Sequence, residues 1–286
     1  MQLIQWFVRF LGWMPKCLKY LLANIIGLYL VYLPTQCKRL TRQNIALAYP
    51  DDGDHQRAVL ARNSLRELCN KLFDLITTWV RPVDYSLRQV SQITGFDEFQ
   101  LQSRDKPTLV LLPHIGNWEV FGVWLSQYRS YTAMFRPLRV PALSDLVLQA
   151  RERGGNRLVP ATTAGARQIL KCLKRSDMAI VLPDQAPKDG NGLYVPFFGH
   201  EVLTPVLPYR LAISSDAIVF IGAALKRKHG YEVVFRRMAS AAIHEQHEWL
   251  TLMNQEIERL VRTDPAQYQW EYRRFRNAPD GTLRYR

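Results

Sequence analysis

The alternation of short apolar runs with helix-like stretches constrains the fold of this chain more than any other feature of its sequence. The apolar runs lie at residues 108–112, 131–135, 157–160, 178–182, 217–225 and 231–235. Helical patterns begin near Trp118 and cover 143–153 and 164–174. Strands separated by helices are typical of right-handed βαβ units, whose parallel sheet is covered on both faces. We therefore predict an α/β fold with a mostly parallel central sheet flanked by helices.

Two longer amphipathic helices are predicted on either side of this region. Apolar residues recur every three or four positions at Leu65, Leu68, Leu72, Leu75 and Trp79, and again at Ile243, Leu250, Met253, Ile257 and Leu260. This spacing places apolar side chains on one face of a helix. We expect the first helix to end at Arg81-Pro82, because proline cannot continue it.

The N-terminal segment is the most apolar part of the chain. Arg9 is the only charge before Lys16, and the run between Lys19 and Lys38 has 18 uncharged residues, interrupted by Pro34. A membrane-spanning helix needs about 20 apolar residues, so this run is of borderline length. Its aromatic residues and basic flanks are typical of membrane interfaces. We predict an uncleaved anchor, either a short span or a helix pair in one leaflet; the alternative is a helix buried in the protein's own core.

Charge and length give further expectations. Lysine and arginine number 38 against 25 acidic residues, a net charge of +13, so we expect an anionic partner such as a membrane surface, a phosphorylated lipid, an acidic protein or nucleic acid. The 286 residues favour one large domain. We assign residues 1–42 to the anchor and 43–286 to this domain.

Several common functional motifs do not occur in the sequence. GxGxxG, GxxxxGK[ST], GxSxG and HExxH are all missing. His244 and His247 are three residues apart, but no third metal ligand lies nearby, so a solvated helix face explains them better. We expect no metal and no cofactor. RNA-recognition, helix-turn-helix and zinc-finger patterns are also missing, so we do not expect a nucleic-acid partner.

A histidine and a glutamate follow the apolar run at 108–112, in the order Pro113-His114-Ile115-Gly116-Asn117-Trp118-Glu119. Ligands of open parallel sheets bind beyond the carboxyl ends of strands, where His114 falls. Asn117 can cap a helix whose first turn contains Glu119, leaving His114 in the loop where its ring can meet that carboxylate. The carboxylate would fix the tautomer and leave the other ring nitrogen as a general base. With no enzyme nucleophile nearby, the nucleophile would be a substrate hydroxyl; the alternative is a structural histidine.

The block P-H-I-G-N-W-E-V-F-G resembles the H-x4-[D/E] motif of glycerolipid and lysophospholipid acyltransferases. It is more closely similar to the bacterial lipid A biosynthesis late acyltransferase family. Other blocks of that family occur in the same order: R-Q-N-I-A-L-A-Y-P at 42–50, F-R-P at 135–137, the basic pair Arg151 and Arg153, L-P-D-Q at 182–185, V-P-F-F-G at 195–199, and D-P-A-Q-Y-Q-W with R-R-F at 264–275. Several ordered blocks are more specific than any one of them.

The resemblance implies a membrane-bound O-acyltransferase that uses no metal and no covalent enzyme intermediate, because a thioester is already activated. It would move a fatty acyl chain from acyl carrier protein to a hydroxyl of a lipid A-type glycolipid precursor. This would occur on the cytoplasmic side of the cell inner membrane, among membrane lipids. His114 would be the general base, oriented by Glu119. Residues 43–286 would form the acyltransferase catalytic domain.

The same resemblance suggests residues that bind substrate or organise the site. Arg151, Asp184 and Arg136 match family positions of this kind. The backbone N–H groups at the Gly116–Trp118 helix start, which include that of Asn117, or the Arg151 guanidinium, are candidate donors to the oxyanion.

One block departs from the family pattern and leaves the acceptor open. The family often has a polar Asn-Asp-Asn-type run after [YF]-R-P, whereas this chain has Leu138-Arg139-Val140. A lysophospholipid or another glycolipid as acceptor, with acyl-CoA or acyl carrier protein as donor, is therefore an alternative. A more distant one is a non-catalytic basic protein that binds anionic lipid or nucleic acid.

Overall fold

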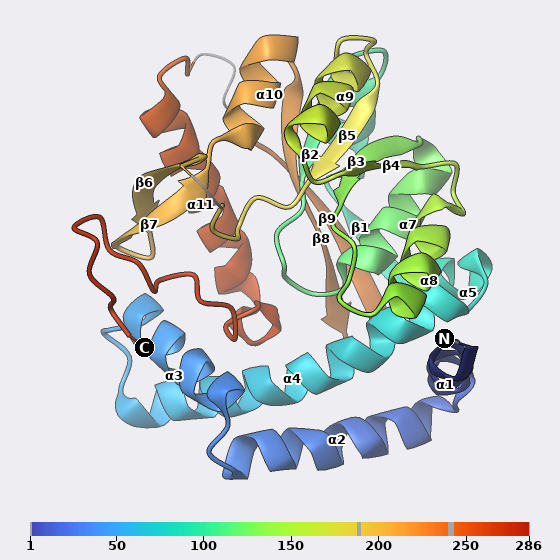
Figure 1. The fold of residues 1–286 in the computed structure, drawn as a ribbon, viewed down its shortest axis with the longest axis vertical. Coiled ribbons are helices and arrows are strands. Elements are labelled where there is room, and N and C mark those ends of the chain that lie inside the picture. The colour runs from blue at the N-terminus through green and yellow to red at the C-terminus, as the bar shows by residue number, and fades with distance from the viewer. Residues whose placement is uncertain (1, 188–189, 240–242, 286) are drawn as a thin grey trace.

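The computed structural model describes residues 2–187, 190–239 and 243–285. Its strands are β1 Val90–Thr94, β2 Thr108–Leu111, β3 Tyr131–Phe135, β4 Arg157–Pro160, β5 Met178–Val181, β6 Gly192–Phe197, β7 His200–Pro205, β8 Ile218–Arg227 and β9 Gly230–Arg237. Within these residues, seven strands form one sheet in the order β1-β9-β8-β2-β5-β3-β4 (Figure 1). All neighbours are parallel except β8 and β9, which form an antiparallel hairpin. The predicted α/β fold with a mostly parallel sheet is confirmed.

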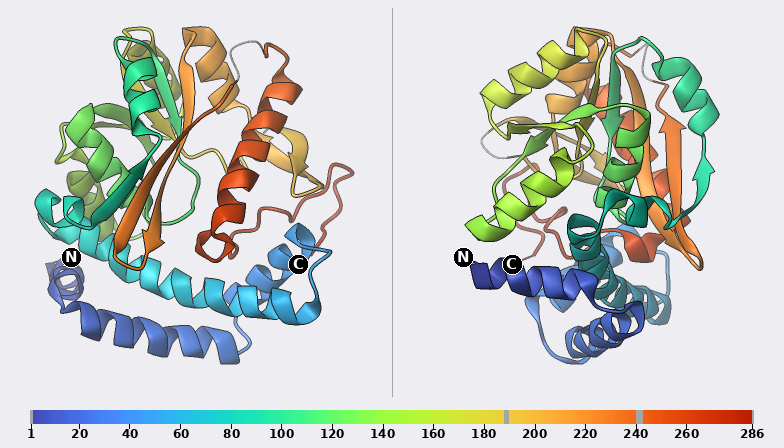
Figure 2. Two further views of the ribbon diagram at one scale, coloured as in Figure 1. Left: turned by 180° about the vertical axis from the view of Figure 1, so that it is seen from behind. Right: turned by 90° about the vertical axis from the view of Figure 1, so that its right-hand side faces the viewer.

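Helices cover both faces of this sheet. The helices of the described residues are α1 Gln2–Trp13, α2 Lys16–Tyr32, α3 Gln36–Ala48, α4 Asp54–Val80, α5 Val83–Leu87, α6 Phe96–Ser103, α7 Trp118–Tyr128, α8 Pro141–Glu152, α9 Thr163–Leu173, α10 Leu207–Ser215 and α11 Gln246–Thr263. The apolar side chains of α9, α10 and α11 share one core cluster, and those of α6 and α7 belong to another on the opposite face. Figure 2 shows these layers from two further sides.

The central strand β2 explains why two cores form. Leu109 and Leu111 belong to the first cluster, and Val110 and Leu112 to the second, because successive side chains of a strand point to opposite faces. All four are at most 3% exposed. A strand buried on both faces has a continuous apolar sequence, which is the pattern that predicted it.

The six predicted strands correspond to β2, β3, β4, β5, β8 and β9, but three further strands were not predicted. β1 is an edge strand whose residues are mostly exposed, so it lacks an apolar pattern. β6 and β7 form a separate antiparallel hairpin that turns at Phe198 and Gly199, both with positive φ. Short irregular hairpins and exposed edges produce weak periodicity.

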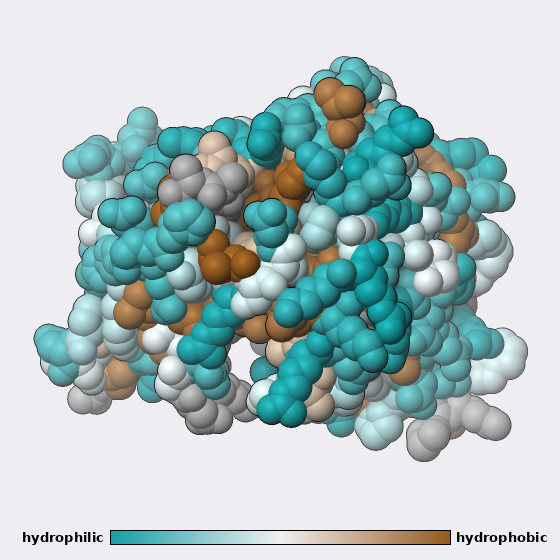
Figure 3. All heavy atoms as spheres, turned by 90° about the horizontal axis from the view of Figure 1, so that it is seen from above, coloured by the Kyte–Doolittle hydropathy of each residue, from teal (hydrophilic) through white to brown (hydrophobic). Residues whose placement is uncertain are grey.

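The N-terminal helices α1 and α2 lie outside α4, at one end of the molecule (Figures 1 and 2). Among the described residues no single helix is long and apolar enough to cross a bilayer, although α1 and α2 together meet the criterion as a pair bent by 110°. Their large apolar side chains remain exposed, including Trp6 at 70% and Tyr32 at 73%. The face over α9 and α10, at the opposite end, is mostly hydrophilic (Figure 3). Residue 42, our predicted domain boundary, lies within α3.

Candidate active site

His114 and Asp184 meet beyond the carboxyl ends of two neighbouring strands. β2 and β5 are parallel with Leu111 opposite Val181, so the residues three positions beyond each strand lie side by side. The His114 backbone N–H donates to Asp184 Oδ2 over 2.9 Å, and Nδ1 of the ring lies 2.8 Å from Oδ1. The carboxylate therefore fixes both the loop and the ring.

The protonation of this pair follows from its surroundings. Asp184 is only 3% exposed. Burial alone would raise the pKa of its carboxyl, but the charge and the hydrogen bonds of His114 outweigh that effect and the pKa lies below its ordinary value. An ionised carboxylate only accepts hydrogen bonds, so Nδ1 carries a proton, and in the neutral form of the ring the lone pair is on Nε2. That arrangement is the one a general base requires.

Glu119 does not orient His114, and this prediction was wrong. Glu119 lies in the first turn of α7, as predicted, but its carboxylate pairs with Arg151 at the end of α8. Arg151 Nη2 donates over 2.6 Å to Oε1, and Nε lies 3.1 Å from both oxygens. The carboxylate is 6% exposed and needs a compensating charge, which the Arg151 guanidinium supplies. Arg151 uses two of its three guanidinium nitrogens, Nε and Nη2, to bind Glu119.

The Glu119–Arg151 pair is expected to stabilise the fold that positions the loop. Glu119→Gln leaves the largely buried guanidinium without its charge partner, which costs about 3 kcal/mol and lowers the melting temperature by about 5–10 °C. Thermal unfolding followed by circular dichroism measures the loss. Glu98→Gln is the matched control, because Glu98 pairs with Arg237 at the surface at 4.0 Å. Equal melting temperatures for the two variants would contradict the assignment.

Gly116 and Asn117 fix the loop after His114 rather than bind an oxyanion. Gly116 has a φ of 60°, and a Cβ there would lie 2.1 Å from the carbonyl oxygen of Ala224. Its N–H donates to the Gln267 carbonyl, and that of Asn117 donates to the Ala224 carbonyl, so these two of the predicted donors are occupied. The Asn117 side chain caps α7 as predicted, accepting from the Val120 N–H over 3.1 Å.

Arg136 and Arg153 occupy different surroundings. Arg136 follows β3, is exposed, and interacts electrostatically with Tyr272. The Tyr272 hydroxyl accepts from the Ala186 N–H, two residues after Asp184. Arg136 is therefore near the wall of the site and able to meet an anionic substrate. Arg153 instead donates to backbone carbonyls at the end of α4, including that of Thr78.

Sequence analysis missed the Gln185 amide beside His114 Nε2 and the Gln269 amide that Gln185 binds. Gln185 Nε2 lies 3.4 Å from His114 Nε2 and donates to Gln269 Oε1 over 3.1 Å. The Trp118 ring packs edge-on against the imidazole, with centroids 5.1 Å apart. Both glutamines lie in blocks that the sequence comparison had picked out, but their proximity depends on the folded C-terminal segment.

Asn44 on α3 holds that C-terminal segment in place. Its Nδ2 donates to the carbonyls of Trp270 and Tyr272, each over 2.6 Å, and its Oδ1 accepts from the Tyr285 hydroxyl. Asn44 is 1% exposed, so these bonds are shielded from water. They give a physical reason for the asparagine in the block at 42–50.

Comparison with known proteins identifies the class of this chain. Residues 2–277 match the family of bacterial lipid A biosynthesis acyltransferases. A lipid A biosynthesis acyltransferase of Haemophilus influenzae is 24% identical over 275 residues, covering 92% of this chain and 87% of the relative. The lipid A biosynthesis palmitoleoyltransferase of Escherichia coli is 23% identical over 246 residues, covering 85% and 79%. A phosphatidylinositol mannoside acyltransferase of Mycolicibacterium smegmatis is 32% identical over 116 residues, covering 39% and 38%.

The chain is an acyltransferase, and the resemblance predicted from its motifs is confirmed. It belongs to the bacterial lipid A biosynthesis acyltransferase family.

Proposed function

We propose that the protein transfers a fatty acyl chain from an acyl carrier protein thioester to a hydroxyl of a lipid A-type glycolipid precursor, with His114 as general base. The observation that most supports this is the His114–Asp184 pair, whose 2.8 Å contact uses Nδ1 and leaves Nε2, beside the Gln185 amide, for the substrate. Relatives that span most of the chain are lipid A biosynthesis acyltransferases by name.

The proposed reaction needs one proton shuttle. His114 Nε2 takes the proton as the acceptor oxygen attacks the thioester carbonyl carbon. The tetrahedral intermediate then collapses, the C–S bond breaks, and the leaving thiolate receives the proton from Nε2. The Asp184 carboxylate stabilises the imidazolium between these steps.

Gln185 is our proposed donor to the oxyanion. Its Nε2 lies beside Nε2 of His114. A substrate hydroxyl must take the place of this amide to reach the base, and the displaced amide would then lie within reach of the thioester carbonyl oxygen. Such donors contribute about 10²–10³ in rate.

We propose that α1 and α2 lie in one leaflet of the inner membrane, with the sheet on the cytoplasmic side. Along α2 only Lys19, Ala23 and Gly27 are buried, so the helix packs on α4 through one stripe and exposes apolar residues elsewhere. An exposed apolar surface of this kind is typical of membrane-binding helices. The net charge of +13 favours both anionic lipids and an acidic carrier protein.

A donor competition tests the proposed reaction. The purified full chain receives acyl carrier protein and coenzyme A thioesters with different isotopic labels on the acyl chain, together with a lipid A precursor. We expect the mass of the precursor to increase by that of one acyl chain, which carries the isotopic label of the acyl carrier protein thioester. Gain from acyl-CoA instead would contradict the proposed donor, and no gain from either donor would contradict the proposed acceptor.

A different glycolipid is the second candidate acceptor. The partial relative is named for phosphatidylinositol mannoside, and the exposed Leu138 and Val140 replace the family's polar run. A parallel reaction with phosphatidylinositol mannoside or a lysophospholipid as acceptor distinguishes these cases. Acylation of one of these lipids, but not of the lipid A precursor, would assign the enzyme to that substrate.

A further inference from the structure

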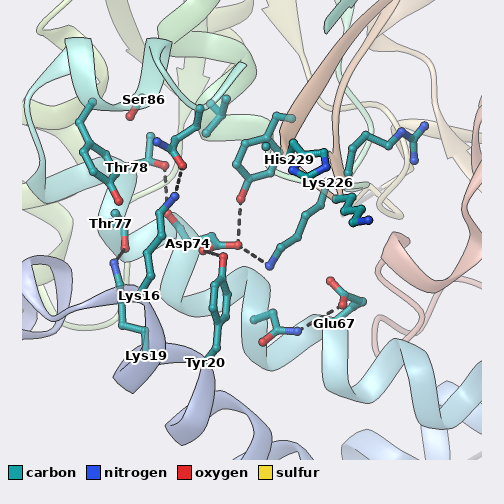
Figure 4. Close-up of a pocket in the computed structure, with 18 of the residues that line it drawn as sticks. Lys16, Lys19, Tyr20, Glu67, Asp74, Thr77, Thr78, Ser86, Lys226 and His229 are labelled. Atoms are coloured by element: carbon teal, nitrogen blue, oxygen red, sulfur yellow. Dashed lines mark hydrogen bonds and ion pairs between the residues drawn. The ribbon is translucent and has the colours of Figure 1, made fainter. Parts of the chain in front are cut away.

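A cavity of about 590 Å³ lies between α2, α4 and the β8–β9 hairpin, and one of its lining residues, Tyr231, bonds to Asn117. Figure 4 shows its side chains: Lys16 and Lys19 enter from α2, while Lys226 enters from β8. Asp74 of α4 lies between them and binds Lys226 Nζ and the Tyr231 hydroxyl, each over 2.9 Å. The cavity is large enough for a small polar ligand, and no role in acyl transfer explains it.

Positive charge around this cavity exceeds negative charge. Its lining has five lysine and arginine side chains, Lys16, Lys19, Lys226, Arg227 and Lys228, against the carboxylates Glu67 and Asp74. Arg227 pairs with Glu232 and Asp264, and Lys226 pairs with Asp74. Among the residues that the structure describes, Lys16, Lys19 and Lys228 have no carboxylate within ion-pair distance. Three lysines thus line one cavity without a carboxylate partner, although Lys16 Nζ donates to the Gln89 side-chain oxygen.

Lys19 is the most informative of the three. Its side chain is buried, at 3% exposure, and its ammonium donates to the Thr77 hydroxyl over 2.7 Å. Burial lowers the pKa of Lys19, Asp74 opposes that effect, and the charges of Arg81 and Lys16 add to it. A buried ammonium has three donors and is costly unless paired. An anion bound in the cavity would supply the missing acceptors.

We propose that this cavity binds a phosphate ester, held by Lys16, Lys19 and Lys228. Lysine ammonium groups bind phosphate as point charges, and several together exclude neutral ligands. The cavity borders α2, whose outer face is apolar and exposed, so a lipid headgroup can enter while its acyl chains stay against that face. We therefore expect the bound phosphate ester to be the headgroup of a membrane lipid. A soluble phosphate ester has the same chemistry and is the second candidate ligand.

The cavity is also connected to the catalytic loop. Tyr231 lines it, donates to Asp74, and accepts from Asn117 Nδ2 over 3.3 Å. Asn117 caps α7 three residues after His114. A bound headgroup would thus contact the network that holds the base, without touching the reacting atoms.

This proposal is tested by measuring binding rather than activity, so the result does not depend on whether the proposed acyl transfer is correct. The full chain in neutral dodecyl maltoside micelles is titrated by calorimetry with dihexanoyl phosphatidylglycerol, and separately with glycerol 1-phosphate. We expect saturable binding of the lipid at one site. Lys19→Met should weaken it about 10- to 100-fold, because a charged hydrogen bond to the phosphate is lost.

A second variant avoids the buried Lys19, whose replacement could disturb folding. A third variant controls for the change in net charge. Lys16→Gln with Lys228→Gln changes only exposed side chains and should weaken binding at least about tenfold. Lys171→Gln with Lys174→Gln removes the same charge from exposed positions at the end of α9 and should leave binding unchanged. Equal weakening by the two pairs, or no weakening by Lys16→Gln with Lys228→Gln, would overturn the site. Equal affinity for glycerol 1-phosphate, lost in the same variants, would support the site and assign it to soluble phosphate esters.

Discussion

His114→Ala is expected to reduce acyl transfer by about 10²–10⁴-fold, the range of general-base contributions. Nε2 of His114 is the base that our mechanism uses, and alanine supplies no group to take the hydroxyl proton. Transfer of radiolabelled acyl chain from acyl carrier protein to the lipid fraction measures the loss. The protein should remain folded, because the ring is only one of several groups that hold the loop.

His55→Ala is the matched control for that experiment. His55 is exposed at the start of α4, far along the chain from the site, so its removal should leave the rate unchanged. Full activity of His114→Ala with a normal melting temperature would remove the proposed mechanism. Loss of activity in both variants would point to a general defect of the preparation.

Asp184→Asn is expected to reduce the turnover by about 10⁴-fold while preserving the shape of the site. In a histidine–aspartate pair the amide holds the imidazole in the wrong tautomer, with the proton on the nitrogen that should act as base. Glu119→Gln should cost stability, as argued above, but far less turnover at a temperature where it is folded. The ratio of the two rates therefore shows which carboxylate orients His114.

Acid unfolding provides an independent check on Asp184. Its pKa in the folded protein lies below the ordinary value of about 3.9, so its ionised form adds stability above that value. This stability is lost as the pH falls through the lower, folded pKa. Asp184→Asn cannot lose it, so the wild type and the variant should converge in stability at low pH. A constant stability difference between the two down to acid pH would contradict the assignment.

Most of the parallel sheet was predictable, because strands buried on both faces have distinctive apolar runs. The partner of His114 was not predictable in the same way. Glu119 is close in sequence, whereas Asp184 is brought to His114 only by the pairing of β2 with β5. Strand order depends on contacts between distant segments, which periodicity does not record. The contacts of Gln185 with the imidazole and with Gln269 have the same origin.

The Glu119–Arg151 pair illustrates a second limit of reasoning from sequence. Both residues were singled out, each with a role in chemistry, and the structure pairs them with each other instead. A buried carboxylate is stabilised by the nearest suitable cation, and the nearest one here comes from a helix 32 positions later in the chain.

The three hydrogen bonds of Asn44 connect α3 to the C-terminal segment beside the proposed active site. The segment with Gln269 and Tyr272 rests on α3, which directly follows the apolar helices. A truncation that removes the apolar N-terminal helices to improve solubility would therefore disturb the C-terminal segment beside the active site. Exchanging N-terminal helices between relatives would require refitting the C-terminal tail at the same time.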